Sequence, residues 1–227
     1  MLKPKLRQQE QGFTLLEVIV AILIATVFVT ITMQAMVMAA LLKTRAKEYS
    51  EAIAWVQEDL EAAKYKAALY QKTTLSSAVA QNATSIVVNS ADGFVANDTI
   101  LIDVDSQTYT ITGISGNTLT ISPGVVNPLG YAANALVVGN KRCNATGSSL
   151  GFGAGFQGLI ATNQVINPNP KQFSTGRYFT MVRTPTPVNS VPYTRLRIDY
   201  EVKPTTGGTA VANMNAEILP DAALRCP

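Results

Sequence analysis

One acidic residue interrupts a long apolar segment near the start of the chain. Glu17 lies inside the run 13–42, and residues 18–42 carry no charge. A carboxylate in such a segment costs on the order of 2.5–3.5 kcal/mol when the segment enters a membrane, so it needs a cationic partner. Gly12 precedes the run, and a cut after Gly12 would give Phe13 a free α-amino group. That amino group could pair with Glu17 of a neighbouring copy once such helices bundle.

The apolar run is long enough to cross a membrane as a helix. Residues 18–42, at about 1.5 Å per residue, would span about 38 Å, more than the ~30 Å hydrocarbon core. Lys3, Lys5 and Arg7 make the preceding residues 1–12 basic, as expected of a segment that stays in the cytoplasm. An ordinary signal peptide has a shorter apolar region followed by a small-residue cleavage site. We therefore expect a membrane anchor whose C-terminal bulk is translocated.

The order of these features closely resembles the prepilin motif of type IV pilins and type II secretion pseudopilins. The residues that carry the resemblance are Gly12-Phe13-Thr14-Leu15-Leu16-Glu17, after a basic leader and before a long apolar helix. It implies cleavage after Gly12 by a prepilin peptidase, N-methylation of Phe13, and assembly with other pilin subunits through Glu17. It also implies a precursor in the inner membrane and a mature subunit in a periplasmic or extracellular filament. The alternative is an ordinary signal anchor with a stray glutamate.

The helix is expected to continue beyond the membrane segment to about Tyr70. Apolar residues at spacings of three and four form one stripe, with Trp55 beside it. The stripe consists of Ile53, Val56, Leu60, Ala63 and Ala67. Charged residues occupy mostly the other positions, as in a helix packed on a sheet. We expect residues 1–12 to be a leader, 13–42 a membrane and filament-core helix, and 43–75 its amphipathic continuation.

Short segments rich in Val, Ile and Thr predict strands after the helix. Within residues 76–140 we expect a compact antiparallel β-module, with strands at 85–89, 99–104, 107–112 and 118–121. Residues 141–227 are expected to hold a long surface loop and then a C-terminal sheet. The loop is placed at 141–176, and the strands at 177–183, 194–202 and 214–219. The predicted class is α+β: a pilin-like fold with a long N-terminal helix on an antiparallel sheet, plus a small β-module.

The chain has two cysteines, Cys143 and Cys226. An even number of cysteines in an exported chain predicts one disulfide, and two buried free thiols are the alternative. The predicted bond is similar to the C-terminal disulfide of many pilins, although it closes a longer loop. It would fasten a chain end that otherwise frays.

Composition speaks against an enzyme. The chain has no histidine, and histidine is the commonest general base and a common zinc ligand. No serine or cysteine has the spacing of a nucleophile–base pair. Asp103 and Asp105 could supply oxygen ligands to calcium, but two acids at strand spacing more often lie on one solvent-exposed face. The glycines at 151, 153, 155 and 158 lack the spacing and the lysine of a phosphate-binding loop. We therefore expect no catalytic residue, no metal and no cofactor.

The C-terminal part of the chain is basic. Residues 141–227 hold nine Lys and Arg against four Asp and Glu, a net charge of +5. Four arginines alternate with aromatic residues and form a candidate nucleic-acid patch: Arg177, Arg183, Arg195 and Arg197. The commoner use of such residues is a solvated sheet face or a subunit contact.

Three functional hypotheses follow from the motif and the basic region. The first is a structural subunit of a bacterial type IV pilus, most simply a minor pilin. The second is a pseudopilin of a type II secretion system. The third is a pilus-associated subunit that binds DNA or a surface.

Overall fold

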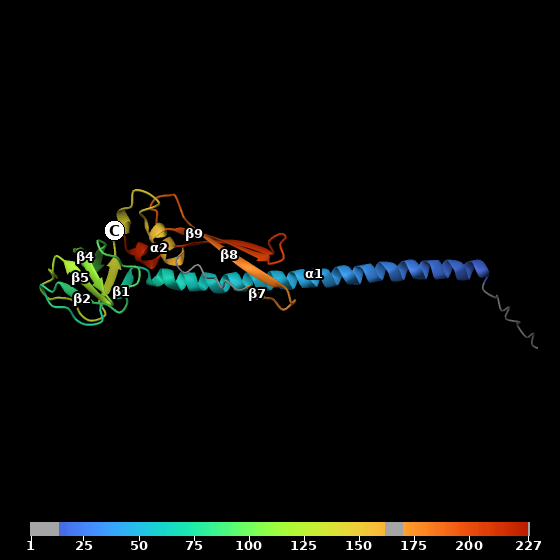
Figure 1. The fold of residues 1–227 in the computed structure, drawn as a ribbon, viewed down its shortest axis with the longest axis horizontal. Helices are drawn as coiled ribbons and strands as arrows, with labels where there is room; N and C mark the ends of the chain where they lie inside the picture. The colour runs from blue at the N-terminus through green and yellow to red at the C-terminus, as the bar shows by residue number, and fades with distance from the viewer. Residues whose placement is uncertain (1–13, 162–169, 227) are drawn as a thin grey trace, which may run out of the picture. The chain divides into compact units, whose positions relative to one another are not determined.

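The computed structural model describes residues 14–161 and 170–226 and consists of one long helix followed by two antiparallel sheets (Figure 1). The predicted α+β class is confirmed. The chain divides into two compact units, here called the N-terminal unit (residues 1–47) and the C-terminal unit (residues 48–227).

Helix α1 runs over Leu15–Leu69, as the sequence predicts. Within the C-terminal unit its buried apolar residues are Ala52, Trp55, Val56, Leu60, Ala63 and Ala67. Four of the five residues of the expected stripe are buried, and Ala52 and Trp55 join them, while Ile53 is only half-buried. The helix ends before Gln71, whose φ of 51° is left-handed and cannot continue a right-handed helix. Residues 72–74, which the predicted helical segment included, form a strand instead.

The first sheet has six strands, in the order β1-β6-β3-β4-β5-β2, and all its pairs are antiparallel. Its strands are β1 (Lys72–Thr74), β2 (Ser85–Val87), β3 (Thr99–Ile102), β4 (Thr108–Ser115), β5 (Thr118–Ser122) and β6 (Leu136–Gly139). Four of these lie where the sequence predicts strands, while β1 and β6 were not predicted individually. Its core includes Leu75, Ile100, Tyr109 and Leu119, each fully buried.

The second sheet has four strands in the order β10-β9-β8-β7. They are β7 (Lys171–Gln172), β8 (Tyr178–Pro187), β9 (Leu196–Pro204) and β10 (Ala212–Ile218). Alternate residues of β9 are buried, as predicted: Leu196, Ile198, Tyr200 and Val202. They share one core with the buried stripe of α1 in the C-terminal unit and with a second helix, α2 (Phe152–Ala161).

Helix α2 corrects the prediction of a continuous surface loop over residues 141–176. Its Phe152, Phe156 and Ile160 are buried at the spacing of one helical face. The neighbouring glycines reflect close packing rather than a loop. A Cβ on Gly153 would lie 2.2 Å from the Arg195 carbonyl oxygen, and one on Gly151 would lie 2.1 Å from that of Tyr193. Part of the predicted loop lies outside the described residues.

A disulfide joins Cys143 to Cys226, with 5.2 Å between their Cα atoms. Cys143 lies in the short helix η1 (Lys141–Asn144), and Cys226 follows η2 (Asp221–Arg225). The salt bridge between Lys72 Nζ and Asp221 Oδ2, at 2.8 Å, connects η2 to β1. The C-terminal end is thus tied both covalently and by charge.

Candidate assembly site

The first turn of α1 has a defined N-terminal cap. The backbone N–H of Glu17 lies 3.0 Å from the carbonyl oxygen of Thr14 and 3.4 Å from its hydroxyl oxygen. Thr14-Leu15-Leu16-Glu17 has the Thr-x-x-Glu spacing of a capping box, and an acid in the first turn is favoured by the helix dipole. The sequence analysis did not predict this helix cap, although the Thr-x-x-Glu pattern indicates one. Glu17 therefore suits the helix start as well as an intermolecular contact.

The carboxylate of Glu17 is available to a partner from outside the chain. Among the described residues it forms no ion pair, and its side chain is exposed. Gly12 and Phe13, the predicted cleavage and methylation residues, lie outside the described residues. The geometry of the motif is therefore visible only from Thr14 onward.

The N-terminal unit presents an apolar helix surface. By length and composition α1 could cross a membrane, and its most apolar window, near the N-terminus, is wholly exposed. The threonine hydroxyls of this segment donate to carbonyl oxygens of the same helix: Thr26 to Leu23, Thr30 to Thr26 and Thr32 to Phe28, at 2.9, 2.7 and 3.0 Å. These hydroxyls are therefore compatible with a hydrocarbon environment, where unbonded polar groups are costly.

One face of this segment is hollowed by about 390 Å³ between apolar side chains. The lining residues are Val20, Leu23, Ile24, Val27, Phe28 and Ile31. An exposed, purely apolar groove along a helix is suited to the side chains of another apolar helix or to lipid.

The four arginines of the candidate nucleic-acid patch each contact a carboxylate. Two contact α1: Arg177 pairs with Glu48 and Arg183 with Asp59, each at 3.0 Å. The other two pair within the sheet: Arg195 with Glu217 at 2.7 Å, and Arg197 with Asp199 at 2.8 Å. Nucleic-acid binding needs an excess of positive charge over a surface, and here the charge of each arginine is locally compensated. The candidate nucleic-acid patch stays a prediction.

The Asp59–Arg183 pair belongs to a buried network between α1 and the four-stranded sheet. The Arg183 side chain is only 7% exposed, and its Nη2 also donates to the Ile160 carbonyl oxygen at 3.0 Å. The Tyr200 hydroxyl donates to Asp59 at 2.7 Å. Burial raises the pKa of Tyr200, and the hydrogen bond to Asp59 raises it further. This network fixes which face of α1 lies on the sheet.

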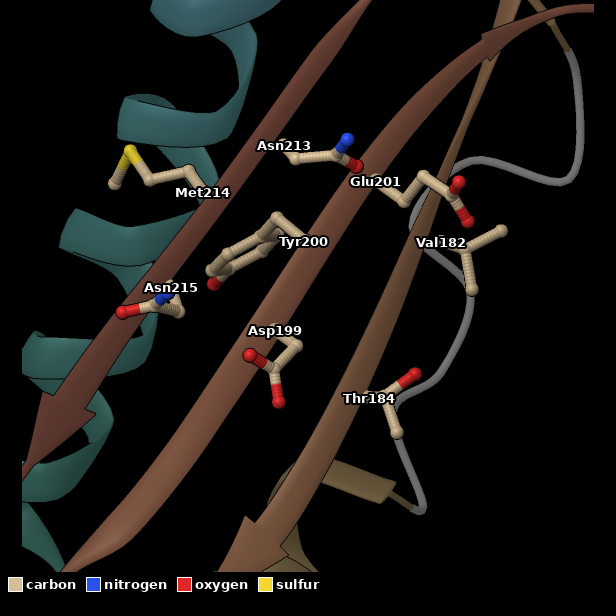
Figure 2. Close-up of a pocket in the computed structure, with 8 residues that line it drawn as sticks. All are labelled: Val182, Thr184, Asp199, Tyr200, Glu201, Asn213, Met214 and Asn215. Atoms are coloured by element: carbon tan, nitrogen blue, oxygen red, sulfur yellow. The ribbon is translucent and has the colours of Figure 1, made fainter. Parts of the chain in front are cut away.

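The four-stranded sheet also carries a hollow of about 310 Å³ with a mixed polar and apolar lining, shown in Figure 2. It is lined by Val182, Thr184, Asp199, Tyr200, Glu201, Asn213, Met214 and Asn215. Asp199 and Glu201 are each paired with a neighbouring cation on β9, Arg197 and Lys203. Across residues 14–161 and 170–226, no group of three acids or cysteines is arranged to hold a metal. The two carboxylates beside the hollow are therefore already neutralised by cations of the same strand.

The prokaryotic N-terminal methylation motif matches residues 7–33 of the chain. No curated protein and no solved structure matches the chain. The matched segment contains Gly12, Phe13 and Glu17 and all six residues that line the apolar groove, and it ends well before the two sheets. The motif, which extends into the long apolar helix, together with the two antiparallel sheets that follow, supports a type IV pilin-like protein.

Proposed function

We propose that the chain is a structural subunit of a bacterial type IV pilus, specifically a minor pilin. A prepilin peptidase cuts it after Gly12, and the mature subunit, N-methylated at Phe13, leaves the inner membrane to enter the filament. The observation that carries the proposal is the methylation motif on an exposed apolar helix. In this scheme residues 1–12 are the leader, 13–42 the anchor and filament core, and the rest the exported part.

The assembly step follows from the position of Glu17. In the membrane, its carboxylate is unfavourable until a cation approaches it. The α-amino group of a processed neighbour supplies that cation, so pairing removes two membrane penalties together. The C-terminal unit needs no such partner, because its buried acids Glu48 and Asp59 are neutralised inside the chain. Assembly is therefore driven from the N-terminal unit.

The first test is the mass of the subunit in filaments sheared from cells. The expected chain begins at N-methylated Phe13 and lacks residues 1–12. An intact Met1, or an N-terminus beyond Leu42, would contradict the proposal. Recovery from surface filaments supports a pilus subunit, whereas retention in the periplasm together with a secretion defect on deletion supports a pseudopilin.

The second test is Glu17→Ala co-expressed with the wild-type chain. The variant should be cleaved normally and keep its sheets, yet enter filaments at least tenfold less often. Glu10→Ala is the matched control, because cleavage removes residue 10 and leaves the mature subunit unchanged. Equal incorporation of Glu17→Ala and wild type would show that Glu17 is only a helix cap.

A further inference from the structure

Three cations surround α1 directly after its apolar run: Lys43, Arg45 and Lys47, here called the basic ring. All three residues are exposed. At about 3.6 residues per turn, Lys43 and Lys47 lie one turn apart on one side of the helix, and Arg45 lies on the opposite side. Residues 18–47 contain no acid, so this part of the helix has a net charge of +3. The positive charge is thus concentrated at the C-terminal end of an apolar segment.

The acids that could neutralise the ring along the helix are engaged elsewhere. Opposite charges three or four residues apart can pair on a helix surface, and Glu48 and Glu51 have these spacings from the second and third cations of the ring. Glu48 instead pairs with Arg177 at 3.0 Å and is only 2% exposed. Glu51 accepts hydrogen bonds from the backbone N–H of Ser174, at 2.9 Å, and from its hydroxyl. Within residues 14–161 and 170–226, the ring therefore has no ion-pair partner.

The length of the apolar segment brings the ring to a membrane surface. Lys43 and Lys47 lie about 39 and 45 Å beyond Glu17 along the helix, at about 1.5 Å per residue. A bilayer with both headgroup layers is about 40–45 Å thick, and a helix tilt of about 20° shortens the span by only about 2–3 Å. A helix that crosses the membrane with Glu17 near one surface therefore carries the ring into the opposite headgroup layer.

Side chains of this kind at this place reach back to lipid phosphates. In an α-helix each Cα–Cβ bond is tilted toward the N-terminus, and the apolar segment lies on the N-terminal side of the ring. Lys43 and Lys47, with about 5–6 Å between their Cβ atoms, can bind one phosphate together. Arg45 offers a planar fork of N–H donors, which fits a phosphate in a bidentate manner. The ring thus has donors for headgroups on both sides of the helix.

The orientation of the chain makes this charge unfavourable without a partner. Cations that flank a membrane-spanning helix favour the cytoplasmic side, whereas the ring lies on the translocated side in the proposed function. Before processing, Lys3, Lys5 and Arg7 oppose it from the cytoplasmic side, and cleavage after Gly12 removes all three. The mature helix therefore keeps its Lys and Arg residues only on the side where the positive-inside rule disfavours them.

We propose that the basic ring is a binding site for the phosphate groups of anionic phospholipids in the leaflet on the translocated side. Lys43 and Lys47 hold one headgroup, and Arg45 holds a second on the other side of the helix. These contacts fix the depth of the mature helix in the membrane after the leader has been removed. The inference rests on the membrane stage of the proposed function and goes beyond it, because neither cleavage nor filament assembly requires a lipid site.

Spin-labelled lipids measure the site directly. The mature chain, which begins at Phe13, is reconstituted into phosphatidylcholine vesicles with a small amount of spin-labelled phosphatidylglycerol or spin-labelled phosphatidylcholine. The fraction of label immobilised at the protein gives the relative association of the two lipids. Phosphatidylglycerol should associate about threefold more strongly. One cation–lipid contact near an anionic surface corresponds to about fivefold, and the measurement averages over all lipids around the helix.

Salt and free phosphate separate the possible sources of this preference. About 1 M NaCl should lower it to less than about twofold, because salt screens the ring. About 10 mM inorganic phosphate at constant ionic strength should leave it unchanged. Loss of the preference with inorganic phosphate alone would show a site for free phosphate and would overturn the inference.

Substitutions assign the preference to the ring. Lys43→Gln/Arg45→Gln/Lys47→Gln should lower the ratio to about 1, and glutamine preserves the helix because its propensity is close to that of lysine and arginine. The variant Lys43→Arg/Arg45→Lys/Lys47→Arg keeps the charge and should keep the preference. The matched control is Lys64→Gln/Lys66→Gln, which removes cations of the same helix beyond the ring and should change nothing. Equal association of both lipids with the wild-type chain, or an unchanged preference in the triple glutamine variant, would overturn the inference.

The proposed function and this inference fail in different ways. If the wild-type chain is absent from filaments, or if Glu17→Ala is incorporated equally, the filament role is wrong, whatever the vesicles show. If the chain enters filaments but does not prefer phosphatidylglycerol, only the lipid site is wrong. A loss of incorporation in the triple glutamine variant would then assign the ring to acids of a neighbouring subunit.

Discussion

In the N-terminal unit the described charged side chains, Glu17, Lys43, Arg45 and Lys47, are exposed and form no ion pair among the described residues. From Glu48 onward, acids and arginines pair across elements, and Glu48 itself is only 2% exposed. The switch falls at one point of a continuous helix. It separates an exposed helix, which has no internal ion pair in its described part, from a folded unit in which the buried acids Glu48 and Asp59 pair with arginines of the same chain.

The apolar side chains show the same contrast. Leu23, Phe28 and Met36 are 58%, 67% and 72% exposed, whereas the C-terminal unit holds two cores, one below each sheet. A helix whose apolar residues are all outside gains its stability from a membrane or from neighbouring helices. The C-terminal unit should need neither, and the following predictions test that difference.

Removal of residues 1–44 should give the largest effect of the changes considered, on membrane association. A chain that begins at Arg45 keeps every residue of the two cores, since burial begins at Glu48. It should move completely from the membrane to the soluble fraction and still unfold cooperatively. Cell fractionation and a thermal unfolding scan monitored by circular dichroism check both points. An unfolded or aggregated product, with the disulfide formed, would show that the C-terminal unit depends on the N-terminal one.

Cys226→Ser should cause the next largest effect, on the stability of the C-terminal unit. The disulfide joins residues 83 positions apart, and the chain-entropy treatment assigns such a loop at most about 4–5 kcal/mol. That is a large part of the free energy of unfolding of a typical domain, about 5–15 kcal/mol. Urea unfolding of the Arg45–Pro227 chain should show a much lower midpoint. Cleavage after Gly12 in the full chain should be unaffected.

Leu224→Ser is the control for Cys226→Ser, because Leu224 lies nearby and is 66% exposed. Its unfolding free energy should stay within about 0.5 kcal/mol of wild type. Thiol labelling of the denatured, unreduced chain provides a direct check. Two reactive cysteines would show that the bond does not exist in the protein.

Asp59→Ala and Glu58→Ala form a matched pair of adjacent substitutions. Asp59 pairs with the buried Arg183 and accepts from Tyr200, so its loss leaves a buried cation and should cost about 3–5 kcal/mol. Glu58 pairs with Lys171 at 3.7 Å, and its side chain is 75% exposed, so its loss should cost about 0–1 kcal/mol. Denaturant unfolding of both variants measures the difference. Equal effects would contradict the assignment of Asp59 to the core.

The sequence predicts best where one physical requirement acts on a long segment. The apolar run and its stripe predict α1 to within a few residues, because helical periodicity persists over many turns. The alternation in β9 predicts its buried face for the same reason. The motif around Glu17 was visible because a charge in an apolar segment is rare.

The sequence predicts poorly where a distant partner decides the role of a residue. Asp59 is one of several charged residues beside the apolar stripe, and its sequence neighbours do not reveal its buried role because its partner, Arg183, is 124 residues away. Glycines at 151, 153 and 155 suggested a loop, whereas Gly153 allows α2 to approach the backbone at Arg195. Phe152, Phe156 and Ile160 carried a helical signal, but glycine composition outweighed it. These errors concern contacts between residues that lie far apart in the sequence.

Asp98→Asn should give the smallest effect, and one that depends on pH. The Asp98 side chain is 2% exposed, accepts from Gln71 Nε2 at 2.7 Å and the Val95 N–H at 3.2 Å, and lies 3.9 Å from Lys141 Nζ. Burial raises the pKa of Asp98, although the hydrogen bond from the Val95 N–H and the positive charges of Arg142 and Lys141 partly oppose this. The folded state therefore binds the proton more readily than the unfolded state does. In wild type, this contribution to stability grows as the pH falls through the raised pKa.

The amide of Asp98→Asn does not titrate, so the variant does not gain the stability that wild type gains at low pH. Its free energy of unfolding, relative to wild type, should be highest near pH 7 and should fall by about 1 kcal/mol or less as the pH falls toward 4. Asp105→Asn provides a control of opposite sign. The Tyr131 hydroxyl donates to Asp105 at 2.7 Å and lowers its pKa, so wild type loses that contribution as the pH falls. Urea midpoints of both variants of the Arg45–Pro227 chain, measured between about pH 3 and pH 7, should therefore diverge from wild type with opposite slopes, the Asp105 effect mainly below about pH 4. Parallel slopes would show that Asp98 is not held in a desolvated site.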